Sequence, residues 1–184
     1  MGKRLFFWEL GGFLFTAAMG ALLRALYPWA GGLSAPAAAV NGSLWEEMKT
    51  LFVPVFLFSL VQILLLAGAY PRLPEVRVLS VLFGLGLMPV VYYTYSGILG
   101  RSLPWVDGAL PYLADLGMFW LDFRLLRRGR RPARWRQILG LASLWGLAFL
   151  FVWCTFRPPD LALWRDPAAP GPSPEILASD SRRP

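Results

Sequence analysis

The stretch Asn41-Gly-Ser-Leu-Trp-Glu-Glu-Met-Lys49 gathers side chains that suit ligand recognition. Trp45 and Lys49 are four residues apart and Glu46 precedes Lys49 by three, so in a helix the three side chains can share one side. A carboxylate, an ammonium group and an aromatic ring near a membrane surface can together bind a polar lipid headgroup or a small zwitterion. The stretch is therefore the first candidate for a binding site.

A structural role explains part of the same stretch. Ser43-x-x-Glu46 fits a capping box, in which the Ser43 hydroxyl accepts from the Glu46 amide and the Glu46 carboxylate accepts from the Ser43 amide. Glu46 and Glu47 also suit the positive end of a helix dipole. Asn41-Gly-Ser matches a glycosylation acceptor, although this pattern is short and common. Capping leaves Trp45 and Lys49 unexplained, so the binding interpretation stays open.

Three aspartates lie in the fourth apolar block, at Asp107, Asp115 and Asp122. Asp115 and Asp122 are seven residues apart and fall on nearly the same helix face, with Asp107 roughly 80° away. Ionisable residues inside a membrane span usually face protein or water. We expect Asp107 at the outer mouth, Asp122 near the inner surface beside Arg124, and Asp115 deep in the span. The pattern fits structural ion pairing, with an ion or proton path as the alternative. Glu9 and Arg24 are too far apart to pair with each other, and we expect each to have a partner elsewhere in the bundle, such as an inner-loop arginine for Glu9.

Two further motifs combine aromatic and small residues. Tyr92-Tyr-Thr-Tyr-Ser-Gly-Ile-Leu-Gly100 has tyrosines that suit a membrane interface and small residues that allow close helix packing, with the lining of a polar cavity as the alternative. In the segment 155–167, Pro158 and Pro159 end a helix. The apolar residues that follow predict a lid or plug on the membrane surface, with a plain tail as the alternative.

The sequence contains no histidine and one cysteine, Cys154. Catalysis by Ser–His–Asp or Cys–His and histidine-based metal sites are therefore excluded. A lone cysteine in an apolar run cannot form an intrachain disulfide and behaves as a small hydrophobe. We predict no metal and no cofactor.

Hydrophobic residues make up 57% of the 184 residues, with a mean hydropathy of +0.51. They form five blocks of about the 20 residues that cross a bilayer. The sequence therefore predicts an all-α integral membrane bundle, with one domain over residues 1–168 and a disordered tail over 169–184. The first block also fits a signal peptide, but its length and Glu9 favour an uncleaved helix. The predicted spans are about 5–27, 51–70, 76–99, 103–126 and 137–156.

Basic residues set the predicted orientation. With the N-terminus inside, eleven of the 18 Lys and Arg residues fall on the inner side and seven on the outer side. The positive-inside rule therefore places the N-terminus inside and the C-terminus outside. Seven of the inner arginines lie between Arg124 and Arg136, in a loop between two apolar blocks. The expected partner of this loop is anionic lipid, not nucleic acid.

Three motifs in order resemble an uncharacterised bacterial family of multi-pass membrane proteins, filed as domain of unknown function number 6512. They are Asn-x-Ser-x-Trp-Glu-x-x-Lys, Tyr-Tyr-Thr-Tyr-x-Gly-Ile-Leu-Gly and Phe-x-Pro-Pro-x-x-x-Leu-x-x-Asp-Pro. The resemblance covers about residues 5–168 and implies a bacterial plasma membrane location but no activity. The matching positions are Asn41, Ser43, Trp45, Glu46, Lys49, Tyr95, Gly97, Gly100, Asp107, Pro158, Pro159, Asp166 and Pro167.

This chain departs from the family pattern at two positions. The first motif of the family commonly reads Asn-Glu-Ser-x-Trp-Glu-His, whereas Gly42 replaces the Glu here and Glu47 replaces the His. A catalytic or metal role of these positions would then be lost, or Glu47 would have to substitute.

The predicted topology brings the motifs together on the outer side. We hypothesise an outward-facing pocket that binds a lipid headgroup or a small polar ligand. One alternative is a membrane-embedded enzyme with Glu46 or Asp107 as general base, and another is a small transporter, against which the lack of a repeat argues. Membrane lipid is the expected partner, and a homodimer is compatible with five short spans. The predicted pocket residues are Asn41, Trp45, Glu46, Lys49, Tyr95 and Asp107.

Overall fold

The computed structural model describes residues 2–30, 42–128, 133–157 and 159–164. In it, the long apolar runs of the sequence fold into helices, and prolines, glycines and charged residues lie in the turns between them. The described residues contain no strand, which confirms the all-helical class. The helices are α1 (Gly2–Ala30), α2 (Leu44–Leu66), α3 (Leu73–Leu99), α4 (Pro104–Leu126), α5 (Arg134–Phe156) and the short 3-10 helix η2 (Ala162–Trp164).

Local sequence explains several helix ends. Before α2, the Ser43 hydroxyl accepts a hydrogen bond from the Glu46 amide at 3.4 Å, which is the first half of the predicted capping box. Helix α4 begins at Pro104, which has no N–H to leave unpaired. Helix α3 ends at Gly100, whose φ of 67° is left-handed and free of strain only for glycine.

The second helix differs from the predicted span over residues 51–70. It begins at Leu44 and ends at Leu66, so the whole Trp45–Lys49 stretch is helical. Hydropathy alone does not predict this start, because the first two turns carry the charged residues Glu46, Glu47 and Lys49. The Ser43 cap is the feature that determines where the helix begins. The predicted tail over residues 169–184 lies outside the described residues.

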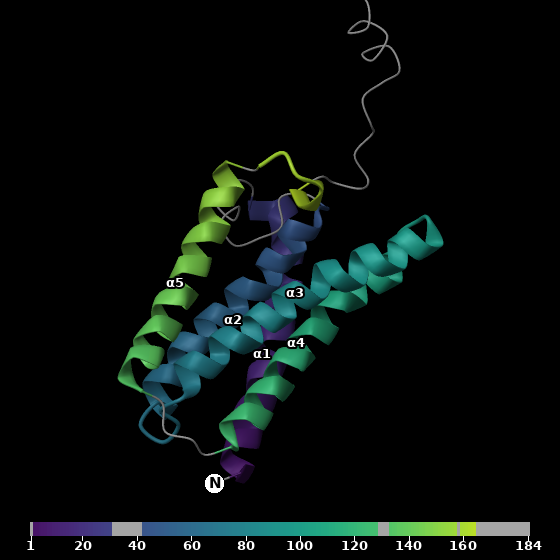
Figure 1. The fold of residues 1–184 in the computed structure, drawn as a ribbon. Coiled ribbons are helices and arrows are strands. Elements are labelled where there is room, and N and C mark those ends of the chain that lie inside the picture. The colour runs from purple at the N-terminus through teal and green to yellow at the C-terminus, as the bar shows by residue number, and fades with distance from the viewer. Residues whose placement is uncertain (1, 31–41, 129–132, 158, 165–184) are drawn as a thin grey trace, which may run out of the picture.

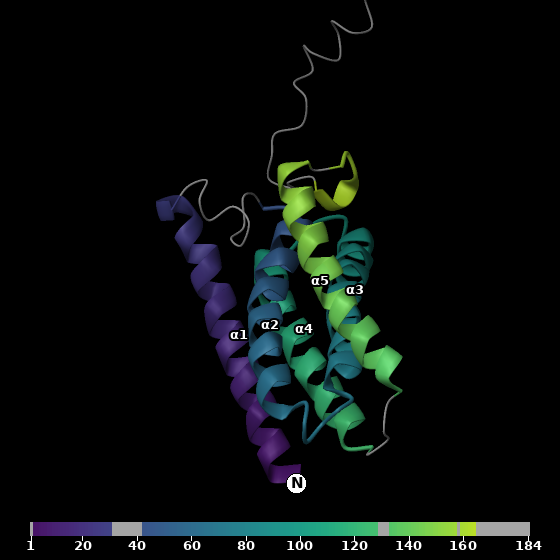
Figure 2. The same cartoon turned by 90° about the vertical axis from the view of Figure 1, so that its left-hand side faces the viewer.

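The five helices alternate in direction along one bundle (Figure 1). We call the end with the start of α1, the α2–α3 turn and the end of α4 the basic end. The opposite end, with the start of α2, the α3–α4 turn and η2, is the motif end (Figure 2). Helix α1 packs on α2 and α4, while α3 packs on α2, α4 and α5. The predicted motifs at residues 42–49 and 92–100 therefore meet at the motif end.

The outer surface of the bundle is apolar. Side chains such as Leu64 and Ile98 are 84% and 79% exposed, which is unfavourable in water and typical of a lipid-facing surface. Four of the five helices are long and apolar enough to cross a membrane, and α4 with its three aspartates falls short of this measure. Five spans and the predicted orientation remain predictions.

A column of four aromatic rings joins three elements near the motif end. The Trp45 ring lies 4.3 Å from the Trp164 ring of η2 and 4.6 Å from the Phe151 ring of α5, measured between centroids. Phe151 in turn lies 4.8 Å from Phe52 of α2. Aromatic pairs at these distances are favourable beyond their buried area, so the column holds η2 and α5 on α2.

Helix α5 approaches the start of α3 at Gly140. A Cβ atom added at this glycine would lie 2.7 Å from the carbonyl carbon of Pro74, where backbone cannot move aside. The close contact between α3 and α5 therefore requires glycine at this position.

We expect Gly140→Ala to lower the free energy of unfolding by about 1–3 kcal/mol, because the added methyl group must push α5 away from α3. Gly146→Ala on the same helix is the matched control, because an added Cβ there meets nothing within 4 Å. Unfolding of the detergent-solubilised protein by SDS, followed by circular dichroism, measures both. Equal stabilities of the two variants would contradict the close packing.

Candidate functional site

Three of the predicted pocket residues, Trp45, Glu46 and Lys49, lie in the interior instead of facing a cavity. Their side chains are buried, and Lys49 is fully so. The Lys49 Nζ atom lies 2.5 Å from a carboxylate oxygen of Glu46 and 3.3 Å from the hydroxyl oxygen of Thr155 on α5. With the ring of Trp45 stacked in the aromatic column, this group connects α2 to α5 and η2.

Two other predicted residues, Tyr95 and Asp107, contact each other across the α3–α4 turn. The Tyr95 hydroxyl donates a hydrogen bond to the Asp107 carboxylate and accepts one from the Leu103 amide at 3.4 Å. The pair therefore fixes the start of α4 against the end of α3. The sixth predicted residue, Asn41, lies outside the described residues.

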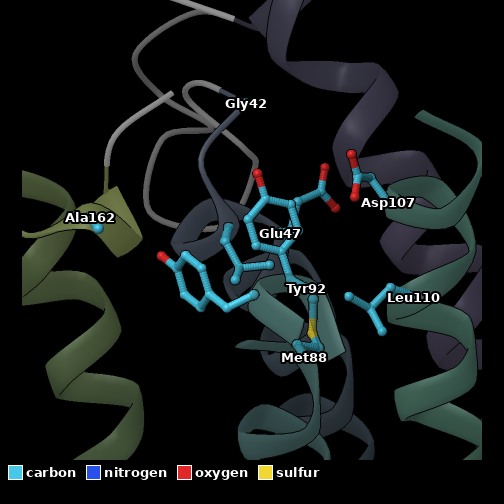
Figure 3. Close-up of a pocket in the computed structure, with 9 residues that line it drawn as sticks. Gly42, Glu47, Met88, Tyr92, Asp107, Leu110 and Ala162 are labelled. Atoms are coloured by element: carbon cyan, nitrogen blue, oxygen red, sulfur yellow. The ribbon is translucent and has the colours of Figure 1, made fainter. Parts of the chain in front are cut away.

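A cavity of about 230 Å³ opens at the motif end between α2, α3, α4 and η2. Figure 3 shows that the carboxylates of Glu47 and Asp107 lie near each other beside the cavity, with Met88 and Leu110 below them. Its lining consists of Gly42, Leu44, Glu47, Met88, Tyr92, Tyr93, Asp107, Leu110 and Ala162. Of the five predicted pocket residues that are described, Asp107 lines this cavity.

Glu47 also has a partner on α1. Its carboxylate forms an ion pair with the guanidinium of Arg24, and both side chains are partly exposed. Arg24 thereby links α1 to the wall of the cavity. The sequence pattern matches Glu47 to the positive end of the helix dipole and predicts a partner for Arg24 on another helix, but it does not connect the two residues.

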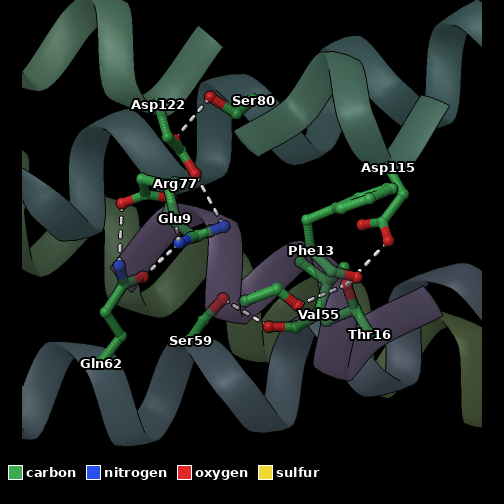
Figure 4. A network of polar contacts seen from close by, with 11 residues as sticks. Glu9, Phe13, Thr16, Val55, Ser59, Gln62, Arg77, Ser80, Asp115 and Asp122 are labelled. Atoms are coloured by element: carbon green, nitrogen blue, oxygen red, sulfur yellow. Dashed lines mark hydrogen bonds and ion pairs between the residues drawn. The ribbon is translucent and has the colours of Figure 1, made fainter. Parts of the chain in front are cut away.

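A buried network of charged and polar side chains joins α1, α2, α3 and α4 nearer the basic end (Figure 4). The Arg77 guanidinium lies 2.7 Å from an Asp122 oxygen and 3.5 Å from a Glu9 oxygen. Gln62 donates to Glu9 at 2.8 Å and accepts from Arg77, and Ser80 donates to Asp122 at 2.6 Å. Glu9 thus has an arginine partner, as predicted, although Arg77 lies within α3 and not in a loop. Asp122, expected beside Arg124 near the inner surface, is fully buried against Arg77 instead.

Asp115 lies apart from this network and closer to the motif end. One of its carboxylate oxygens is 2.7 Å from the hydroxyl oxygen of Thr16 on α1 (Figure 4). The other oxygen is buried and has no hydrogen-bond partner in the described part of the chain. Asp115 therefore has the deep position that the sequence predicted for it, and no ion pair is recorded for it among the described groups.

No group of three acidic or cysteine side chains within the described ranges is placed to hold a metal ion. Glu47 and Asp107 supply two carboxylates, and the tyrosine side chains supply hydroxyl groups and rings. Such a lining can hold a positively charged group, because carboxylates attract it and aromatic rings add a favourable contact.

Residues 4–171 match the profile of a family described as "Family of unknown function (DUF6512)". The chain belongs to this family. The resemblance of the three motifs is thus confirmed. No curated protein and no solved structure matches the chain.

The two positions at which this DUF6512 member departs from the motif pattern both line the cavity. They are Gly42, which follows Asn41, and Glu47, one turn into α2. The matching residues Trp45, Glu46 and Lys49 pack between helices. The substituted positions of the motif thus border the cavity, and the matching residues Trp45, Glu46 and Lys49 face the protein interior.

We expect Arg77→Met in this DUF6512 protein to lower the free energy of unfolding by about 3–5 kcal/mol, because Glu9 and Asp122 would be buried without a counter-charge. Arg101→Met, which alters an exposed arginine in the α3–α4 turn, is the control and is expected to stay within about 0.5 kcal/mol. Combining Arg77→Met with Glu9→Gln and Asp122→Asn is expected to recover part of the loss. Unfolding by SDS measures all variants, and a small effect of Arg77→Met alone would contradict the network's structural role.

Proposed function

We propose that the protein is an integral membrane protein that binds a small organic cation in the cavity at the motif end. The cation would be an ammonium group, carried either by a lipid headgroup or by a small free molecule. The observation that supports this proposal is the pair of carboxylates, from Glu47 and Asp107, on the wall of an otherwise largely apolar cavity.

The charges around the cavity favour a cation. Glu47 is paired with Arg24, whereas Asp107 accepts a hydrogen bond from the neutral hydroxyl of Tyr95. Two carboxylates and one guanidinium leave one negative charge at the cavity wall. In a partly buried site this charge acts through a lower effective dielectric constant than water has, so it attracts a cation more strongly.

The remaining lining suits the organic part of such a ligand. The rings of Tyr92 and Tyr93 lie 5.2 Å apart in an edge-to-face arrangement, and aromatic rings attract ammonium groups through their negative faces. Leu44, Met88 and Leu110 supply apolar surface. A volume of about 230 Å³ is below the roughly 300–1,000 Å³ of pockets for drug-sized ligands, so the ligand or headgroup is small.

The predicted topology places this cavity on the outer side of the membrane. Its wall includes Ala162 of η2, the segment that the sequence analysis interpreted as a lid or a tail. A ligand would then enter from outside or from the outer leaflet, and η2 would form part of the entrance.

A membrane-embedded enzyme is the second candidate, because two carboxylates that share a cavity can divide the roles of acid and base. Asp107 is the residue that would act as general base. Glu46 is the weaker choice because it is paired with buried Lys49 and is not among the residues that line the cavity.

We expect the purified protein to bind tetramethylammonium and ethanolamine but not acetate, measured by isothermal titration calorimetry in detergent. Asp107→Asn should weaken binding at least tenfold, because a charged contact contributes about 1.5–3 kcal/mol. Asp160→Asn, an exposed position outside the cavity lining, is the control.

A second arm separates the two sources of the ammonium group. Nanodiscs of phosphatidylethanolamine should compete with tetramethylammonium if a headgroup is the ligand, and nanodiscs of phosphatidylglycerol should not. Equal affinity of wild type and Asp107→Asn for both ammonium probes would contradict the proposal. Turnover of a bound probe would favour the enzyme.

A further inference from the structure

A second, much smaller cavity lies between α1, α2 and α4. Its volume of about 10 Å³ is close to that needed for a single water molecule. Gly20 helps to keep α1 near α2 here, because an added Cβ would lie 3.2 Å from the carbonyl oxygen of Thr50. The lining consists of Thr16, Ala17, Gly20, Arg24, Thr50, Leu51, Pro111, Tyr112 and Asp115.

Two complementary polar groups in this lining lack partners. The Oδ1 atom of Asp115 is buried without a hydrogen bond among the described residues, and so is the Nε–H group of Arg24. Asp115 as a whole is 1% exposed. An acceptor and a donor that border one small cavity are placed to pair with each other, directly or through one water molecule, and leaving both unpaired costs free energy.

The surroundings of Asp115 favour its neutral, protonated form. The Thr16 hydroxyl oxygen lies 2.8 Å from the Gly12 carbonyl oxygen, 3.1 Å from that of Phe13 and 2.7 Å from Asp115 Oδ2. A hydroxyl group has one hydrogen to donate, and threonine in a helix commonly donates it to the carbonyl four residues earlier. Asp115 is 1% exposed and forms no ion pair within the described ranges, and its carboxyl group has one hydroxyl group, that of Thr16, within hydrogen-bond distance. A buried carboxylate without a counter-charge is costly, so the neutral acid is the favoured form.

Arg24 connects this small cavity to the larger one. Its guanidinium is paired with Glu47, which lines the proposed cation site, and its side chain also lines the cavity beside Asp115. A cation that bound to Glu47 would compete with Arg24 for the same carboxylate. Arg24 would then lack a counter-charge. Because Asp115 borders the same small cavity, its ionised carboxylate could take the place of Glu47 as the partner of Arg24.

We propose that Arg24 is a switch that exchanges a cation for a proton. Without ligand, Arg24 pairs with Glu47 and Asp115 is a neutral acid. When a cation binds Glu47, Arg24 moves to Asp115, and the Asp115 O–H bond ionises and releases its proton to water. One positive charge enters and one leaves, so the net charge of the site does not change. This exchange rests on the proposed cation site, although the switch itself can be tested without any ligand.

Among the described groups around Asp115, Arg24 is the one that can become its counter-charge. Helix α1 contributes Thr16 in addition to Arg24, and α2 contributes Thr50, whose hydroxyl donates to the Glu47 carbonyl at 2.9 Å. From α3, the nearest charge is Arg77, which is already held by Glu9 and Asp122. On α4 itself, Tyr112 also lines the cavity.

Infrared spectroscopy of the full-length protein in detergent tests the switch. The carbonyl band of a protonated carboxylic acid should be present at neutral pH in wild type and reduced in Asp115→Asn. Glu47→Gln should also remove the Asp115 band, because Arg24 loses its carboxylate and turns to Asp115. Adding Arg24→Gln to Glu47→Gln should restore it. Glu47→Ala replaces Glu47→Gln if the latter does not fold by circular dichroism.

Two results would overturn the switch: no Asp115 band in wild type, or a band that persists in both Glu47 variants. A calorimetric arm then tests the exchange with tetramethylammonium. Wild type should bind it up to about tenfold more tightly per unit rise in pH, and Asp115→Asn should bind it without this dependence. If no ammonium probe binds while the infrared results hold, the proposed function fails and the switch stands. If the probe binds without any pH dependence, the exchange fails and the cation site stands.

Discussion

The buried guanidinium of Arg77 is the interaction on which the bundle depends. It neutralises carboxylates from α1 and α4 while it belongs to α3, and Gln62 brings α2 into the same network. In a membrane the hydrophobic effect does not drive helices together, so interhelical polar contacts carry much of the specificity. The network thus fixes how four helices face one another, and the position of α4 in it determines where Asp107 and Asp115 lie.

The sequence predicts much of this architecture because long apolar blocks are a clear signal for membrane-spanning helices. It also predicts the Ser43 cap, the deep position of Asp115 and an arginine partner for Glu9, since an unpaired charge in a span is costly. It does not predict which arginine. Arg77 follows Glu9 by 68 residues, and only the packing of both α1 and α3 on α2 and α4 brings the two side chains together.

The candidate site was harder to predict for a related reason. The spacing of Trp45, Glu46 and Lys49 correctly places them together on α2, but spacing does not say whether a face meets solvent or another helix. Thr155 and Phe151 of α5 cover that face, about 100 residues later in the chain. Glu47, which points to another side of α2, borders the cavity together with Leu44. Which side is covered depends on tertiary contacts that no local pattern encodes.

The stacked rings of Trp45 and Trp164 place an optical reporter beside the cavity. Two indoles at 4.3 Å are close enough for their excited states to couple, which produces a paired signal of opposite signs in circular dichroism. Trp164 ends the same short helix in which Ala162 borders the cavity. Any occupant that displaces η2 would separate the two indoles and remove that signal. The native chain thus carries a label-free sensor of whether η2 is in place on α2.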